Sequence, residues 1–309
     1  MKVLVTGGAG YIGTELVSLL IANPEVDKVI VYDNLSRPNY NLFLGLRLQK
    51  HQKITFIKGE LLDSRALRKV LKDVDVVYHL AAKVTTPFAN ADSHAYEQVN
   101  HWGTAELVYA VEESNSVKRF IYTSSTGVYG SSKIPAHEDT PPDPQTFYAA
   151  SKLRGEQHVR RLINGGKIDT FLMRCGNVYG YSKSMRFDAV INKFIFEANF
   201  NKLVTIQGDG KQSRTFIHID MVAKALNNLL TADLPSDVYN IVDRNLKVID
   251  ILDVLKELIP DLEFIFINQH LRLHELNVKV NPLISDTLHI RNDRSLKEEL
   301  SEFLTKFSF

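Results

Sequence analysis

The chain of 309 residues contains one cysteine, no long hydrophobic run and no excess of charge of either sign. A single cysteine, Cys175, excludes an intramolecular disulfide and a cysteine-based zinc site. No run reaches the roughly 18 apolar residues that span a bilayer, and none suits a signal peptide. The 37 basic and 36 acidic residues give no broad field for nucleic acid or an anionic membrane. We therefore expect a cytoplasmic protein with neither partner and no metal.

Short β-branched runs alternate with helical patterns through the first half of the chain. The apolar runs lie at 3–5, 29–32, 54–57, 74–79, 120–122 and 170–173. Helical patterns fill the gaps, for example at 105–113 and 148–162. Solidly apolar strands that alternate with helices are typical of a parallel sheet covered on both faces. The sequence therefore predicts a doubly wound α/β (Rossmann) fold.

A glycine motif follows the first of these runs. Residues 6–13 read Thr-Gly-Gly-Ala-Gly-Tyr-Ile-Gly, after an expected strand and at the start of an expected helix. Gly7, Gly10 and Gly13 in that context are typical of a turn that lets a pyrophosphate approach a helix N-terminus. Asp33 ends the second run, where a carboxylate accepts ribose hydroxyls and disfavours a 2′-phosphate. This favours NAD over NADP, although Arg37 lies close; the alternative is a glycine-rich turn without a ligand.

Two further segments carry groups suited to catalysis. Tyr148 and Lys152 are four residues apart, so a helix places both side chains on one face. An ammonium near a phenol favours the phenolate, which would let Tyr148 act as a base. A cluster of hydroxyls at 123–126 directly follows an expected strand, where doubly wound sheets bind ligands. The competing interpretations are a solvated helix face and a serine-rich turn.

Together these motifs resemble the NAD-dependent epimerase/dehydratase family of extended short-chain dehydrogenases/reductases, and within it enzymes like UDP-glucose 4-epimerase. The matching segments are 6–13, 33–34, 79–82, Asn100 with 103–104, 124–130, 148–152, 174–180 and 208–220, in family order. They cover the chain from its start to about residue 230. The last 70 or so residues resemble the family only loosely.

The resemblance implies roles for individual residues. Tyr148 would be the general base and acid, Lys152 would lower its pKa, and Ser125 would relay the proton of the sugar. The cofactor NAD would contact Gly7, Gly10, Tyr11, Ile12, Gly13, Asp33, Asn34, Glu60, Leu61, Leu80, Ala81, Ala82, Asn100, Tyr148 and Lys152. A nucleotide-diphosphate sugar would contact Thr85, Thr126, Asn177 and Arg214.

The expected domain organisation follows from where the strand–helix alternation loosens, after about residue 176. We expect an NAD-binding Rossmann domain formed by 1–175 together with about 211–245. A smaller interleaved α/β substrate lobe would comprise about 176–210 and 246–309. Relatives of this family usually form homodimers through two helices, which here would be 105–113 and 148–162.

The residues after the relay hydroxyl narrow the reaction. Thr126 and Gly127 stand where family members that dehydrate the sugar carry an Asp-Glu pair, and neither residue can replace a carboxylate. The chain therefore resembles a 4-epimerase that works through a transient 4-keto sugar, or a 4-keto-sugar reductase. A remote alternative is a non-catalytic regulator that senses dinucleotides, which typically lacks the pair formed here by Tyr148 and Lys152. An Arg-Pro-Gly-Asp stretch common among relatives is missing, so the sugar and its nucleotide stay open.

Overall fold

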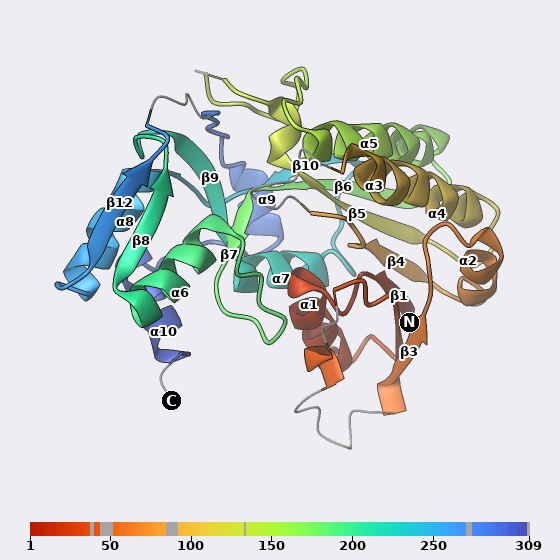
Figure 1. Cartoon of the computed structure of the whole chain (residues 1–309). Helices are drawn as coiled ribbons and strands as arrows, with labels where there is room; N and C mark the ends of the chain where they lie inside the picture. The colour runs from red at the N-terminus through yellow and green to blue at the C-terminus, as the bar shows by residue number, and fades with distance from the viewer. Residues whose placement is uncertain (38–39, 44–51, 85–91, 133, 270–273, 308–309) are drawn as a thin grey trace.

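A seven-stranded parallel sheet forms one half of the molecule in the computed structural model, which describes residues 1–37, 40–43, 52–84, 92–132, 134–269 and 274–307 (Figure 1). The strands run in the order β10-β6-β5-β4-β1-β2-β3. They are β1 (Lys2–Thr6), β2 (Lys28–Asp33), β3 (Ile54–Lys58), β4 (Val76–His79), β5 (Arg119–Ser125), β6 (Asp169–Cys175) and β10 (Asp237–Ile241). Because β1 pairs with both β2 and β4, the strand order reverses beside it. The predicted doubly wound fold is confirmed.

The sheet is apolar on both faces because successive strand residues point to opposite sides. Val3 and Val5 of β1 join one buried core, and Leu4 joins the other. Helices α1 (Tyr11–Ala22) and α7 (Ile219–Asn228) cover the first face. Helices α2 (Ser64–Val70), α4 (Gly103–Glu112) and α5 (Phe147–Gly165) cover the second. Figure 1 shows these two helical layers below and above the sheet.

Local signals fix the helices next to the catalytic segments. Thr146 caps α5, and its side chain accepts a hydrogen bond of 3.1 Å from the backbone of Ala149. The helix ends at Gly166, which has a left-handed φ of 61° that favours glycine. In the same helical layer, α3 (Ser93–Tyr96) continues through a π-helical turn, η4 (Glu97–Trp102), into α4. Single π-helical turns are frequent at functional sites, and this one carries Asn100.

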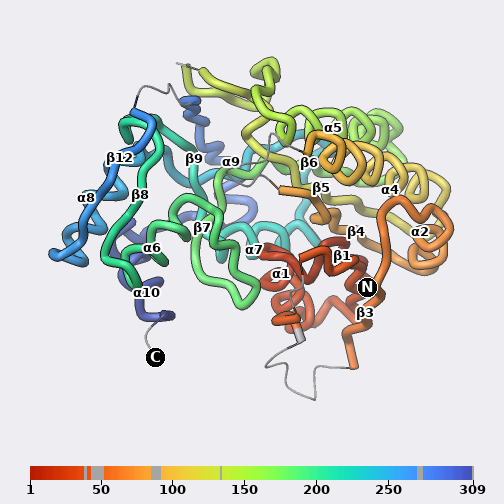
Figure 2. Tube along the Cα trace, in the orientation of Figure 1, coloured from red at the N-terminus to blue at the C-terminus, as the bar shows by residue number. Residues whose placement is uncertain are grey.

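The second half of the molecule holds two small sheets and their own core (Figure 2). Strand β9 (Ser213–His218) lies between β7 (Asn177–Tyr179) and β11 (Arg244–Lys247), while β8 (Leu203–Gln207) pairs with β12 (Glu263–Ile267). Helices α6 (Val190–Asn201), α8 (Val248–Leu258) and α10 (Leu296–Thr305) pack around them. Helix α9 (Pro282–Thr287) instead contributes Ile284 to the core of the large sheet. The predicted domain boundaries stay a prediction.

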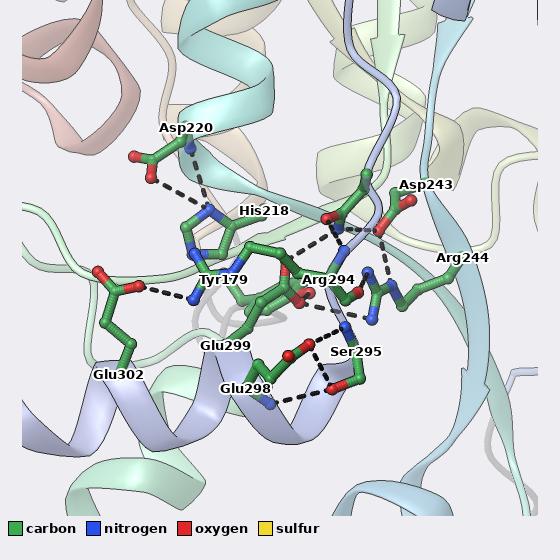
Figure 3. Close-up of polar contacts among 11 residues, drawn as sticks. Tyr179, His218, Asp220, Asp243, Arg244, Arg294, Ser295, Glu298, Glu299 and Glu302 are labelled. Atoms are coloured by element: carbon green, nitrogen blue, oxygen red, sulfur yellow. Dashed lines mark hydrogen bonds and ion pairs between the residues drawn. The ribbon is translucent and has the colours of Figure 1, made fainter.

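Helix α10 is anchored by a buried carboxylate, Glu299, and we call this group of contacts the α10 anchor (Figure 3). Tyr179 of β7 donates to its Oε2, and Asn292 donates to its Oε1 at 2.8 Å. Arg244 of β11 lies 3.5 Å from Oε2 and is also paired with Asp243 at 2.6 Å. The anchor therefore ties the last helix to β11 and to β7, the strand that carries the predicted substrate residue Asn177. No helix in the described part of the chain is long and apolar enough to cross a membrane.

Candidate active site

The glycine motif forms a tight cradle at the N-terminus of α1. Gly7 has a φ of +70°, and a Cβ at this position would lie 2.5 Å from the backbone nitrogen of Ala81. A Cβ on Gly13 would lie 2.4 Å from the carbonyl oxygen of Gly7. The Gly10 amide donates to that same oxygen at 3.1 Å. Only glycine fits these two positions, which leaves the first turn of α1 open to a pyrophosphate.

Asp33 lies beside this cradle, at the end of β2. Its Oδ2 accepts from the amide of Ala9 at 3.1 Å and its Oδ1 from the amide of Leu35 at 2.8 Å. Asn34, the next residue, donates to Glu60 Oε2 at 3.0 Å. The predicted acidic residue is thus brought to the glycine motif, and Asn34 and Glu60 lie together at the same edge.

Two other cofactor candidates on α1 face away from the open turn. Tyr11 donates from its Oη to the carbonyl of Gly180 at 2.6 Å and accepts from Asn192 Nδ2 at 3.1 Å. Burial raises the pKa of Tyr11 above its usual value. Ile12 packs against the core of the sheet. Neither side chain points toward a pyrophosphate at the helix N-terminus, so only their backbone groups remain suited to it.

The segment after β4 lies against the glycine motif. The Leu80 amide donates to the carbonyl of Thr6 at 3.1 Å, and Ala81 is in contact range of Gly7. Asn100 holds the continuation of this segment, because its side chain accepts from the Lys83 amide at 2.8 Å and donates to the Lys83 carbonyl at 2.9 Å. Leu61 and Ala82, also predicted to contact the cofactor, are respectively buried and half-buried. Thr85, a predicted substrate residue, lies outside the described residues.

Asn100 connects this segment with the helix of the catalytic pair. Its Nδ2 also donates to Ser151 Oγ at 3.0 Å, and its own side chain is fully buried. Ser151 lies between Tyr148 and Lys152 in sequence. The π-helical turn therefore places one amide between the end of β4 and the start of α5. This is the contact expected of a residue that supports both the cofactor site and the catalytic helix.

Tyr148 meets Ser125 where β5 ends. Burial raises the pKa of Tyr148, while the positive charge of Arg186 and a hydrogen bond with Ser125 oppose that rise. Ser125 Oγ also accepts from the amide of Gly127 at 3.1 Å. The ring of Tyr96 contacts the Tyr148 ring edge-on, with centroids 6.3 Å apart. The structure brings together the predicted base and the predicted relay hydroxyl.

Lys152 is buried, and no carboxylate is bonded to it in the described residues. Its Nζ donates to the carbonyl of Thr123 at 2.6 Å and lies 4.5 Å from the centroid of the Tyr122 ring. Burial lowers the pKa of Lys152 to about 8. The ammonium is thus held at the end of β5, and its residue lies one helical turn after Tyr148 on α5.

Ser124, the neighbour of the relay residue, is already occupied. It donates to Glu156 Oε1 at 2.6 Å, and the same carboxylate pairs with Arg174 at 2.7 Å. The side chains of Glu156 and Arg174 are 0% and 1% exposed, so this ion pair is entirely internal. Among these neighbouring serines, Ser125 is therefore the one that contacts Tyr148, as the resemblance implies.

The remaining substrate candidates lie toward the second half of the molecule. Thr126 is buried in η5 (Thr126–Tyr129), directly after β5. Asn177 of β7 donates to the carbonyl of Thr215 at 3.0 Å. Arg214, on the neighbouring strand β9, has its pKa lowered by burial and makes no ion pair in the described part of the chain. Asn177 and Arg214 thus occupy adjacent strands of one small sheet.

Sequence reasoning missed two groups near the site. Arg186 follows β7, and its charge acts on both Tyr11 and Tyr148. Tyr96 packs on the ring of Tyr148 from α3. Neither belongs to a motif with fixed spacing, since Arg186 lies in a loop and Tyr96 reaches Tyr148 across about fifty residues of sequence. No signal in the sequence could have singled out either.

The parallel sheet, the glycine cradle and the position of Asp33 at the end of β2 are the features of a doubly wound fold that binds a dinucleotide. The family model described as "NAD dependent epimerase/dehydratase family" matches residues 3–242, and the chain belongs to this family. NAD is the cofactor that the family uses.

Several known proteins are similar over most of the chain. A putative UDP-glucose 4-epimerase from Methanocaldococcus jannaschii is 31% identical, covering 82% of this chain and 81% of that protein. A dTDP-D-glucose 4,6-dehydratase from Dictyostelium discoideum is 32% identical over 78% of this chain, which spans 58% of that protein. The structure of UDP-glucuronic acid 4-epimerase from Bacillus cereus covers 100% of both chains at 26% identity and a TM-score of 0.88. Both epimerases and dehydratases are thus among the similar proteins.

Proposed function

We propose that this protein epimerises a nucleotide-diphosphate sugar, at C4, with NAD as its cofactor. The observation that carries the proposal is the contact of Tyr148 with Ser125, followed in sequence by Thr126 and Gly127. A base and a relay hydroxyl suffice to remove and return the proton of a sugar hydroxyl. Elimination of water from the sugar needs an acid and a base that act on neighbouring sugar atoms. Thr126 and Gly127, at the positions after Ser125, provide no carboxylate for either role. Epimerisation therefore fits these residues better than dehydration.

The residues at the glycine motif fit NAD. Gly7 and Gly13 leave no room for side chains, and the Asp33 carboxylate at the end of β2 suits two ribose hydroxyls. When bound, NAD accepts a hydride from the sugar carbon and returns it. The glycine cradle would hold the pyrophosphate. Asn100 would fix the position of the segment after β4 relative to helix α5.

The chain's own residues would then handle the proton and the sugar. Tyr148 takes the proton of the 4-hydroxyl, directly or through Ser125, and returns it after the sugar has turned. The buried ammonium of Lys152 favours the ionised tyrosine during this step. Asn177 and Arg214 hold the diphosphate while the hexose presents its opposite face. Arg is suited to this because its planar fork matches phosphate oxygens.

One charged residue near Tyr148 and one similar structure bear on which nucleotide sugar is the substrate. The charge of Arg186 acts on Tyr148, and Asp188 pairs with the same guanidinium at 3.3 Å, so an acidic group on the sugar would share this cation with Asp188. One similar structure is titled as a UDP-glucuronic acid 4-epimerase in complex with UDP-glucuronic acid and NAD. UDP-glucuronic acid therefore heads the substrates to be tried, ahead of UDP-glucose and dTDP-glucose.

The first experiment counts the cofactor. The protein is purified without added cofactor and denatured, and the released NAD and NADH are quantified per chain. An epimerase that returns its hydride retains the cofactor, so we expect close to one per chain; the nucleotide sugars are then followed by NMR for inversion at C4. A protein that is isolated empty and consumes NADH or NADPH with 4-keto sugars is the reductase instead, and formation of a 4-keto-6-deoxy sugar would identify a dehydratase.

We also propose a homodimer formed through α4 and α5. The outer faces of these helices carry a set of paired charges and rings, including Arg161 with Glu112 at 3.1 Å and Arg161 over the ring of Tyr109. Light scattering at several concentrations tests the oligomeric state. A species with the mass of one chain at every concentration contradicts the dimer.

A further inference from the structure

The loop between β7 and α6 lies along the N-terminal half of α1, and we call its residues 180–188 the strap. Figure 1 shows this loop descending from β7 beside α1. The glycine cradle opens at the same end of α1. The strap therefore borders the position that a pyrophosphate would take at the helix N-terminus.

Buried polar contacts fasten the strap to α1. Tyr11 Oη donates to the carbonyl of Gly180 at 2.6 Å, and Ser182 Oγ donates to the carbonyl of Tyr11 at 3.3 Å. One turn further on, the hydroxyls of Thr14 and Ser184 are 2.6 Å apart, with both residues 2% exposed. Hydrogen bonds in such surroundings are costly to leave unmade, so the inner edge of the strap is firmly attached.

The outer edge of the strap meets the loop that follows β2. Asn41 Nδ2 donates to the carbonyl of Lys183 at 2.6 Å. Arg37 Nη2 pairs with Asp188 Oδ1 at 3.1 Å, and Asp188 also accepts from Arg186 at 3.3 Å. Arg37 is four residues beyond Asp33, the predicted ribose ligand. The pair of Arg37 and Asp188 thus joins the adenosine side of the cofactor site to the strap.

We propose that the strap retains the bound dinucleotide, with Ser184 as its inner fastening and Asp188 as its outer one. The strap is fastened to α1 on one side and to Arg37 on the other, beside the glycine motif, so release of the pyrophosphate would require one of these fastenings to open. This inference rests on the proposed function, in which a cofactor restored in every cycle has no need to leave. The inference names the residues that keep the cofactor in its site.

The test measures release of the cofactor without any sugar. The full-length protein is loaded with NADH and mixed with a large excess of NAD, and the fall in NADH fluorescence gives the dissociation rate. Asp188→Asn should raise this rate about two- to fivefold, the range set by exposed ion pairs. Ser184→Ala should raise it about fivefold because the buried hydrogen bond that joins the strap to Thr14 is lost, while Thr14 keeps its own hydrogen bond to the carbonyl of Gly10 at 2.9 Å. The double variant should show roughly the product.

Two controls make the result specific. Asp286→Asn breaks an exposed ion pair with Arg291, 2.6 Å long, on a helix that does not contact the strap, and it should release NADH at the wild-type rate. Salt should speed release from the wild type, because it screens the Arg37–Asp188 pair, in which the Arg37 side chain is 56% exposed, and should have little effect on Asp188→Asn. If the Ser184 variants fold poorly, Arg37→Gln removes the outer contact from an exposed position.

The outcomes separate this inference from the proposed function. A wild type that binds NADH, with both single variants and the double variant releasing it at the wild-type rate, overturns the strap and leaves epimerisation intact. Faster release from these variants supports the strap whatever sugar is turned over. Failure of the wild type to bind either nicotinamide dinucleotide rejects the strap and the cofactor assignment together. Absence of C4 inversion with normal NADH binding rejects only the proposed reaction.

Discussion

The carboxyl edge of the seven-stranded sheet and the α10 anchor both bury charged side chains, but they differ in how those charges are paired. At the anchor, Glu299 is bonded to Tyr179, Arg244 and Asn292, and Arg244 has a second carboxylate in Asp243 (Figure 3). At the sheet edge, Glu156 and Arg174 form an internal pair, but Lys152 is bonded to a carbonyl, and burial lowers its pKa. The anchor compensates its charges, whereas the edge keeps a cation at the cost of desolvation.

This difference indicates which residues serve stability and which serve chemistry. A buried ion with a complete set of partners is costly to disrupt, because its partners are then left unpaired. A buried cation held by neutral groups contributes less to stability and remains available to a ligand or a neighbouring phenol. We therefore expect substitutions at the anchor to lower the free energy of unfolding. Substitutions at the sheet edge should lower activity instead.

The largest expected effect is that of Tyr148→Phe on turnover. Removing the phenol deletes the proton acceptor while the ring still packs against Tyr96, so the fold should be unaffected. We expect kcat to fall by about 10³-fold or more, with bound NAD per chain unchanged. Tyr109→Phe, at a half-buried tyrosine of α4, is the matched control and should turn over like the wild type. Wild-type turnover by Tyr148→Phe would rule out the assigned base.

At the anchor, Glu299→Gln should act on stability. The substitution removes the charge opposite Arg244 and weakens the acceptor of Tyr179, both within a site where Glu299 is 4% exposed. We expect a loss of about 2–3 kcal/mol in the free energy of unfolding, less than for a fully isolated pair because Asp243 still serves Arg244. Urea denaturation of the wild type and the variant measures this difference in the free energy of unfolding.

Glu302→Gln is the control for the anchor, since Glu302 lies on the same helix and its pair with Arg294 is about half exposed. This variant should change stability by less than about 0.5 kcal/mol. Equal losses for the two variants would mean that any carboxylate on α10 has the same effect, and the contrast between buried and exposed pairs would fail.

The lowered pKa of Lys152 predicts how stability depends on pH. Between about pH 8 and the ordinary lysine value of 10.5, the unfolded chain holds a proton that the folded chain has lost. The free energy of unfolding contributed by this group therefore rises with pH in that window and is flat below it. Relative to Lys152→Met, the wild type should gain about 2 kcal/mol between pH 8 and pH 10. Urea denaturation across this range measures the gain.

Lys118→Met provides the comparison for this pH dependence, because Lys118 is 81% exposed. Its stability curve should run parallel to that of the wild type over the same range. A parallel curve for Lys152→Met as well would show that the lysine at the sheet edge titrates normally, and the distinction between the two regions would lose its main electrostatic support.

The same contrast explains what could be predicted from the sequence. The six apolar runs predicted six of the seven strands of the large sheet, and Gly7, Tyr148 and Lys152 belong to short motifs of constant spacing. Asp33 follows the glycine motif at a fixed distance, at the end of the second run. The α10 anchor had no such signal, because Tyr179 and Glu299 are 120 residues apart and meet only in the folded chain. The same holds for Thr14 and Ser184, which are 170 residues apart. Motifs of constant local spacing thus allow the candidate residues at the sheet edge to be predicted from the sequence. Side-chain contacts between distant parts of the chain are found only in the structure.

Strands β8 and β12 were also missed, for a related reason. They pair in parallel across an intervening stretch that includes β9, α7 and α8, so neither strand has its partner nearby in sequence. The predicted roles of Asn177 and Arg214 depend on the same region, since both lie on its small three-stranded sheet. These roles came from the resemblance, and they stay predictions.

The smallest expected effect belongs to Arg214, which extends the comparison into the second half of the molecule. Burial lowers its pKa, as for Lys152, and it makes no ion pair in the described part of the chain. Arg214→Met should therefore leave the free energy of unfolding within about 0.5 kcal/mol of the wild type, because no buried partner is left unpaired.

If Arg214 holds the diphosphate, KM for the nucleotide sugar should rise about tenfold with kcat little changed. Arg291→Met, at an arginine that is 72% exposed, should alter neither quantity. A stability loss comparable to that of Glu299→Gln, with KM unchanged, would place Arg214 among the structural charges.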